Sequence, residues 1–117
     1  MLFRSVVQGL GQALIEQVVH DPGSAQLLTG SLMDYALPRA TLLPAMATTL
    51  DQQAPSTTGL LGAKGAGEGG ALGAPPAVVS AVIDALREFG TEHLDMPLLP
   101  ERIWRIIRSS HPRRSHG

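Results

Sequence analysis

Seven glycines within residues 59–73 constrain the fold of this 117-residue chain more than any other feature. The segment reads GLLGAKGAGEGGALG, and each glycine in a helix interior costs about 1 kcal/mol relative to alanine. We therefore expect neither a helix nor a strand here. Because glycine lacks a Cβ, its backbone can approach a bound group and offer N–H donors to it. The segment is the first candidate for a ligand site.

Two charged residues lie among these glycines: Lys64, the only lysine of the chain, and Glu68. One interpretation is a flexible linker with two solvated charges, the usual meaning of a glycine-rich segment. Another is a tight active-site loop in which Glu68 serves as a general base. Composition alone leaves both interpretations open.

A nucleotide-binding loop fits the same glycines less well. Gly65, Gly67 and Gly70 match the spacing G-x-G-x-x-G, but that motif must follow a strand and open a helix directly. We expect the next helix only at Pro75, so we discount a dinucleotide site. A P-loop is excluded because no Gly-Lys-Ser/Thr follows.

The N-terminal part predicts a helix over residues 5–19. Ser5 and Gln8 have the spacing of a capping box, which marks a helix start. Gly9 and Gly11 lie inside this helix and indicate that another element or a ligand packs closely there. The apolar positions that recur every three or four residues, and so form one helical face, are Val6, Val7, Leu10, Leu14 and Val18.

The remaining segments predict an α+β fold, because glycine and proline together occupy 22 positions and long elements are few. We expect a β-hairpin over 16–29 around the Asp-Pro-Gly-Ser turn, an irregular proline-containing middle over 30–58 with a strand at 46–51, and a short strand at 93–99. A helix beginning at the Pro75–Pro76 pair should stop at Gly90.

The C-terminal end predicts one more helix, over residues 101–108, with Ile103, Trp104 and Ile107 on its buried face. We expect residues 109–117 to form a disordered basic tail. The domain prediction is thus residues 1–108 followed by this tail.

Charge and cysteine content narrow the function classes. Nine basic and ten acidic residues give a net charge of −1, which provides no field for nucleic acid or acidic membranes. Zero cysteines exclude disulfides and thiolate metal sites. No signal peptide or transmembrane segment is recognisable. We expect a cytoplasmic protein and no metal held by side chains.

Four motifs in order resemble one family. QGLGQAL at 8–14, LLTGSLMDYALPRA at 27–40, KGAGEGGALGAPPAVVSAVIDAL at 64–86 and DMPLLPERIW at 95–104 are similar to the C-terminal part of the molybdopterin-binding large subunit of the xanthine dehydrogenase, aldehyde oxidase and aerobic carbon monoxide dehydrogenase superfamily. The carbon monoxide dehydrogenase type is the most similar. The resemblance runs from about Val6 to Ile107.

The resemblance implies specific roles. Glu68 would be the catalytic base beside molybdenum, and the backbone of Lys64, Gly65, Ala66 and Gly67 would lie along the cofactor. Gln8 would hydrogen-bond the pterin, with Gly9 and Gly11 allowing close approach.

The family also implies partners. The cofactor would be molybdenum-molybdopterin, in its cytosine dinucleotide form, completed by the remainder of the large subunit. Iron–sulfur (2Fe-2S) and FAD subunits would accept the electrons. We expect the chain to be an oxidoreductase component that is incomplete on its own. The alternative is a non-catalytic interaction module, or a gene remnant, that keeps the family fold.

Overall fold

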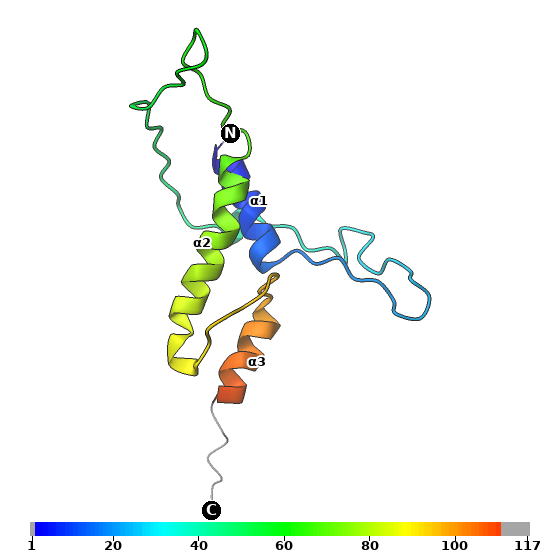
Figure 1. Ribbon diagram of the computed structural model, residues 1–117. Helices are drawn as coiled ribbons and strands as arrows, with labels where there is room; N and C mark the ends of the chain where they lie inside the picture. The colour runs from blue at the N-terminus through cyan, green and yellow to red at the C-terminus, as the bar shows by residue number, and fades with distance from the viewer. Residues whose placement is uncertain (1, 111–117) are drawn as a thin grey trace, which may run out of the picture.

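The structure is a computed structural model that describes residues 2–110. Figure 1 shows helices α1 and α2 side by side, with α3 beyond the C-terminal end of α1. Two long segments without regular structure leave this body, and we call residues 15–39 the first arm and residues 43–68 the second arm. The elements, in chain order, are α1 (Leu2–Leu14), the 3-10 turn η1 (Ala40–Leu42), α2 (Gly69–Ala85), the 3-10 turn η2 (Arg87–Phe89) and α3 (Pro100–Ser110).

The predicted α+β class is wrong for the part of the chain that the structure describes, which contains helices and no sheet. The hairpin over 16–29 reduces to one isolated antiparallel bridge between His20 and Leu27. The strands expected at 46–51 and 93–99 do not form. A two-stranded ribbon is marginal in water without a third strand or a packed face, and Val18, Leu27 and Leu28 are exposed here.

The Asp-Pro-Gly-Ser turn does form in the first arm. The Asp21 carboxylate accepts hydrogen bonds from the Ser24 hydroxyl at 2.7 Å and from the backbone N–H groups of Ser24 at 2.7 Å and Gly23 at 3.1 Å. These bonds, that of the Ser24 side chain first, hold the pKa of Asp21 below its ordinary value. Short-range side-chain bonding of this kind fixes a turn without needing a sheet.

Helix α2 corrects the prediction for the glycine-rich segment. It begins at Gly69, so its first residues belong to that segment, and Pro75 and Pro76 lie inside it. Neither proline can donate an N–H within the helix. Packing compensates, because Pro75 is buried and an ideal Cβ on Gly9 of α1 would lie only 2.9 Å from its Cδ. Tertiary contact therefore outweighs the low helix propensity of this stretch.

Helix α1 begins earlier and ends sooner than predicted, at Leu2 and Leu14. Ser5 lies inside the helix, so its predicted role as an N-terminal cap is wrong. The N–H groups of Ile15 and Glu16 both bond to the carbonyl of Gly11, at 2.9 and 2.8 Å, and the helix ends there.

The hydrophobic core lies where the end of α2, the segment before α3 and α3 itself meet. Leu86, Leu94 and Leu98 form its buried centre, and the partly buried residues packed against it are Leu14, Val79, Val82, Ile83, Phe89, Ile103, Ile106 and Ile107. The N–H of Leu98 donates to the carbonyl of Ala13 at 2.6 Å, which ties the core to α1. Helix α2 ends at Ala85, earlier than predicted, and Gly90 with a left-handed φ of 74° ends the turn η2 that follows.

Helix α3 extends to Ser110, so residues 109 and 110 are helical rather than disordered. The rest of the predicted tail, residues 111–117, lies outside the described residues. Ile103 and Ile107 face the core as predicted, but Trp104 does not and is 53% exposed. Ile106 packs against the core instead, and it lies on the same helical face as Ile103 and Ile107.

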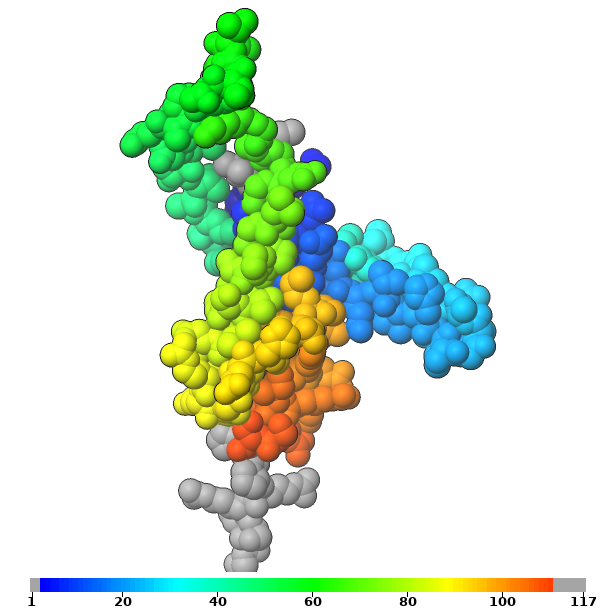
Figure 2. Space-filling view, viewed as in Figure 1, coloured from blue at the N-terminus to red at the C-terminus, as the bar shows by residue number. Residues whose placement is uncertain are grey.

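The molecule has far more surface than a compact protein of its mass. Its radius of gyration is 19.2 Å, whereas a compact chain of this length has about 13 Å. Its accessible surface area is 9512 Å², which is roughly 3,400 Å² more than the area expected for a compact monomer of this mass. The two arms, which stand out from the helical body in Figure 2, account for the large radius and surface area. None of the described helices combines the length and the apolar character that crossing a membrane requires.

Candidate functional site

A hydrogen bond joins α1 to the glycine-rich segment. The Ser5 hydroxyl in α1 donates to the carbonyl of Gly67 at 3.0 Å, across 62 positions of sequence. The glycine-rich loop therefore returns to the start of α1 just before α2 begins. Sequence analysis assigned Ser5 to a local cap and missed this contact, since nothing in the local pattern distinguishes the two roles.

Gly9 and Gly11 have packing neighbours within the chain. A Cβ on Gly9 would lie 2.8 Å from the Ala74 Cβ of α2, so α1 and α2 approach more closely than side chains allow. A Cβ on Gly11 would collide with the Glu16 carboxylate and the Pro38 ring. The packing interpretation of both glycines is confirmed, and their contact with a cofactor stays a prediction.

Gln8 is exposed on α1. It follows Ser5 by three positions, and residues with that spacing are neighbours on a helix surface. The contact between Ser5 and Gly67 therefore lies within one helical turn of Gln8 along α1. An amide offers two donors and an acceptor, which suits the edge of a heterocycle.

Glu68 is the last residue before α2 and is exposed. Its carbonyl accepts the N–H of Leu72 at 2.9 Å, the first bond of the helix, and its side chain makes no capping hydrogen bond. The carboxylate therefore stands at the junction of loop and helix, with its backbone fixed by α2.

Among the described residues, no close neighbour requires glycine at the positions beside Glu68. A Cβ on Gly65, Gly67 or Gly69 would find nothing within 4 Å, and positive φ angles occur elsewhere, at Gly62 and Gly90. Glycine thus costs stability here and leaves a strip of backbone bare. Bare backbone next to an exposed amide and a carboxylate fits a flat, polar organic cofactor that must lie close to the main chain.

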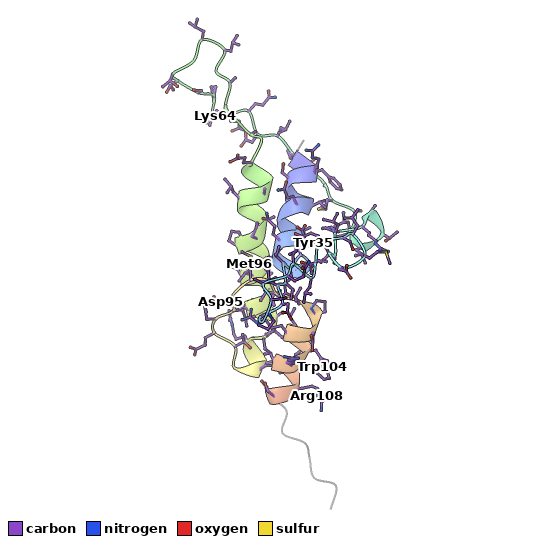
Figure 3. The ribbon with its side chains drawn as sticks, turned by 90° about the vertical axis from the view of Figure 1, so that its right-hand side faces the viewer. Tyr35, Lys64, Asp95, Met96, Trp104 and Arg108 are labelled. Atoms are coloured by element: carbon purple, nitrogen blue, oxygen red, sulfur yellow. The ribbon has the colours of Figure 1, made fainter. Side chains whose placement is uncertain are left out.

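Lys64 lies further out, in the second arm beyond the start of α2 (Figure 3). It is exposed and borders a hollow of about 510 Å³ formed within that arm by residues 50–66. Ser56 and Gly62 close the arm through an N–H to carbonyl bond of 2.9 Å. The structure therefore places Lys64 and Ala66 at this hollow and Gly67 at α1.

Within residues 2–110, no group of three His, Asp or Glu side chains is placed to hold a metal ion. His93 pairs with Asp95 at 3.0 Å, and both side chains are largely exposed. His111 and His116 lie outside the described residues.

Comparison with known proteins supports the resemblance. Residues 5–44 match the model of a molybdopterin cofactor-binding domain. The chain is 39% identical over 103 residues to the nicotine 6-hydroxylase large subunit of Paenarthrobacter nicotinovorans, and 35% identical over 103 residues to the carbon monoxide dehydrogenase large chain of Hydrogenophaga pseudoflava. Each match covers 88% of this chain, and 12% and 13% of the respective relative.

Solved structures show the same backbone. Quinoline 2-oxidoreductase from Pseudomonas putida 86 superposes with a TM-score of 0.79 at 39% identity, over 90% of this chain and 13% of that one. A Cu,Mo-CO dehydrogenase in its carbon monoxide reduced state gives a TM-score of 0.82 at 28% identity, over 93% and 14%.

The matches share one class, the large subunits of molybdenum-containing oxidoreductases. The chain belongs to the family of their molybdopterin cofactor-binding subunits and spans about one eighth of the length of the curated relatives it matches. Its helical fold is that of part of a larger subunit.

Proposed function

We propose that this chain is the C-terminal segment of a molybdenum hydroxylase large subunit and supplies the glutamate loop and pterin contacts of its active site. One observation supports the proposal: the bond between Ser5 and Gly67, which joins α1, three residues before Gln8, to the loop that ends in Glu68. The proposal uses three groups near this bond: the amide of Gln8, the backbone of the glycine-rich loop and the carboxylate of Glu68.

In this proposal Gln8 binds the pterin edge, and the backbone of Lys64, Gly65, Ala66 and Gly67 lies along the cofactor. When bound, the molybdenum cofactor supplies two-electron redox chemistry. Glu68 accepts a proton from the reacting oxygen, because an exposed carboxylate on a fixed backbone can be positioned as a general base. Gly9 and Gly11 serve by letting α2 and the first arm pack against α1.

The remaining parts of the enzyme follow from the family as further proposals. The remainder of the large subunit completes the pocket, and the cofactor is the cytosine dinucleotide form. Partner subunits with 2Fe-2S clusters and FAD carry the electrons away. The assembly works in the cytoplasm.

Replacing Glu68 by glutamine tests the catalytic role. The chain is grafted into the nicotine 6-hydroxylase large subunit in place of the 103 residues it aligns to, and the chimera is produced with that enzyme's other subunits. Glu68→Gln should lower turnover by about 10²-fold or more, the size of a lost general base, while molybdenum per protein stays unchanged.

The matched control is Glu88→Gln, since Glu88 is also an exposed carboxylate but lies in η2 at the opposite end of α2. It should leave both turnover and molybdenum content unchanged. Full turnover in the Glu68 variant would contradict the catalytic assignment and favour the non-catalytic interaction module.

A further inference from the structure

A second surface of the molecule, remote from Glu68, carries an apolar groove. It lies between the end of α1, η1 and α3, and has a volume of about 780 Å³. Its lining is apolar throughout and includes Leu14, Ile15, Leu42, Ile103, Trp104 and Ile107. Figure 2 shows the first arm standing out from the body on one side of this region and α3 on the other.

The groove is open although its walls are hydrophobic. Leu42 is 63% exposed and Trp104 53% exposed. Trp104 points away from the core, and the Arg108 guanidinium stacks on its ring with its central carbon 4.6 Å from the ring centroid (Figure 3). Tryptophan and arginine are both enriched in protein–protein interfaces and among the residues that contribute most to binding.

The comparisons show how much further polypeptide the relatives have beside this part of the chain. In the two solved relatives, the same backbone is only 13% and 14% of one continuous chain. The other part of that chain is tethered to it, so its effective concentration exceeds that of any free partner. The surplus surface of this chain, roughly 3,400 Å² against a compact monomer, lies mainly in the two arms, and the first arm contributes Ile15 and Ala36 to the groove. A surplus of this size is what an obligate contact buries.

We infer that this groove is the seat for an apolar segment of the remaining large-subunit polypeptide, with Trp104 and Leu42 as its anchors. The inference rests on the proposed function for the identity of that polypeptide. It concerns a surface separate from the Glu68 loop, so the two can fail independently.

The experiment compares the same substitutions in two settings. Leu42→Asp with Trp104→Asp places two charges in the groove, and Leu42→Met with Trp104→Phe is the matched control that keeps it apolar. Both pairs are made in the isolated full chain and in the nicotine 6-hydroxylase chimera described above. Thermal unfolding is measured in each, and sedimentation velocity of the isolated chain reports self-association.

In the chimera, the Asp pair should lower the Tm by about 3 °C or more relative to the Met/Phe pair, because two charges would be buried without partners. In the isolated chain the two pairs should differ by less than about 2 °C, because both side chains already face water. A chimera that shows this contrast but contains no molybdenum, or is inactive, would support the groove and contradict the proposed function.

Three results would overturn the inference. The Asp pair could have no more effect than the Met/Phe pair in the chimera, which would mean that the groove stays uncovered. Neither chimera could accumulate as folded protein, which would mean that the subunit body does not accept this chain. The isolated chain could form a dimer that the Asp pair dissociates, which would make a second copy the occupant.

Discussion

Glu16 links the end of α1 to the first arm at the level of single side chains. Its carboxylate lies against Gly11 of α1, where no other residue would fit, and accepts the hydroxyl of Tyr35 at 2.6 Å. This bond fastens the base of the first arm to the end of α1. It also raises the pKa of Tyr35 above its ordinary value of 10.0, chiefly because the donated hydrogen bond stabilises the protonated phenol.

The raised pKa predicts how this contact depends on pH. A group with a higher pKa in the folded state contributes stability that is present below the unfolded value, near pH 10, and is lost as the pH rises through the folded value. Absorbance at 295 nm reports the single tyrosine directly. We expect a midpoint above 10.0 in the native chain and a lower one in Glu16→Gln, where the carboxylate is absent. Equal midpoints would contradict the contact.

The elements hold together chiefly through the pairing of α1 with α2. Gly9 permits this pairing, because a Cβ there would lie 2.8 Å from Ala74 Cβ and 2.9 Å from Pro75 Cδ. The contact explains why α2 forms from Gly69 despite its glycines and prolines. In a helix interior, each glycine costs about 1 kcal/mol and each proline about 3 kcal/mol relative to alanine. The apolar contact between α1 and α2 must therefore offset several such costs.

Substitutions at two glycines, Gly9 of α1 and Gly73 of α2, should change the free energy of unfolding in opposite directions. Gly9→Val should destabilise the helix pair by about 1–3 kcal/mol, the typical cost of overpacking. Gly73→Ala in α2 should stabilise it by about 0.5–1 kcal/mol, because a Cβ there meets nothing within 4 Å. Urea unfolding followed by circular dichroism at 222 nm measures both. Equal effects would mean that α1 and α2 do not pack as described.

At the scale of the whole molecule, the chain is extended and exposes many large apolar side chains. Leu32 and Met33 in the first arm are 79% and 93% exposed, and Leu60 and Leu61 in the second arm are almost entirely so. Monomeric proteins rarely leave this much apolar surface uncovered. The arms therefore expose the kind of apolar surface that another polypeptide normally covers.

The isolated chain should accordingly be poorly soluble or partly molten. We expect it to bind the dye ANS and to show, by small-angle X-ray scattering at low concentration, a radius of gyration near 19.2 Å. A value near 13 Å, the compact expectation, would mean that the arms collapse onto the body without a partner. In the chimera, ANS binding should disappear, because the subunit body covers these surfaces.

The candidate site was partly predictable from the sequence. The bare backbone at Gly65 and Gly67 and the exposed Glu68 were found because glycine is unmistakable in a sequence. The hydrogen bond from Ser5 to Gly67 was not, since a partner 62 positions away leaves no local pattern. The roles of Gln8 and the loop in cofactor binding stay predictions, as does that of Glu68 as a base, which the chimera tests.

The sequence by itself determined the features with short-range causes. These are the Asp21 turn, the left-handed Gly90 that ends η2, and the motifs that identify the family. Each depends on contacts or φ angles within a few residues. Only the tertiary structure decided where α2 begins, that no sheet forms within residues 2–110, and that Trp104 faces outward. Those outcomes depend on which distant surface is available for packing, and the free energy of that packing exceeds the local propensities that a sequence displays.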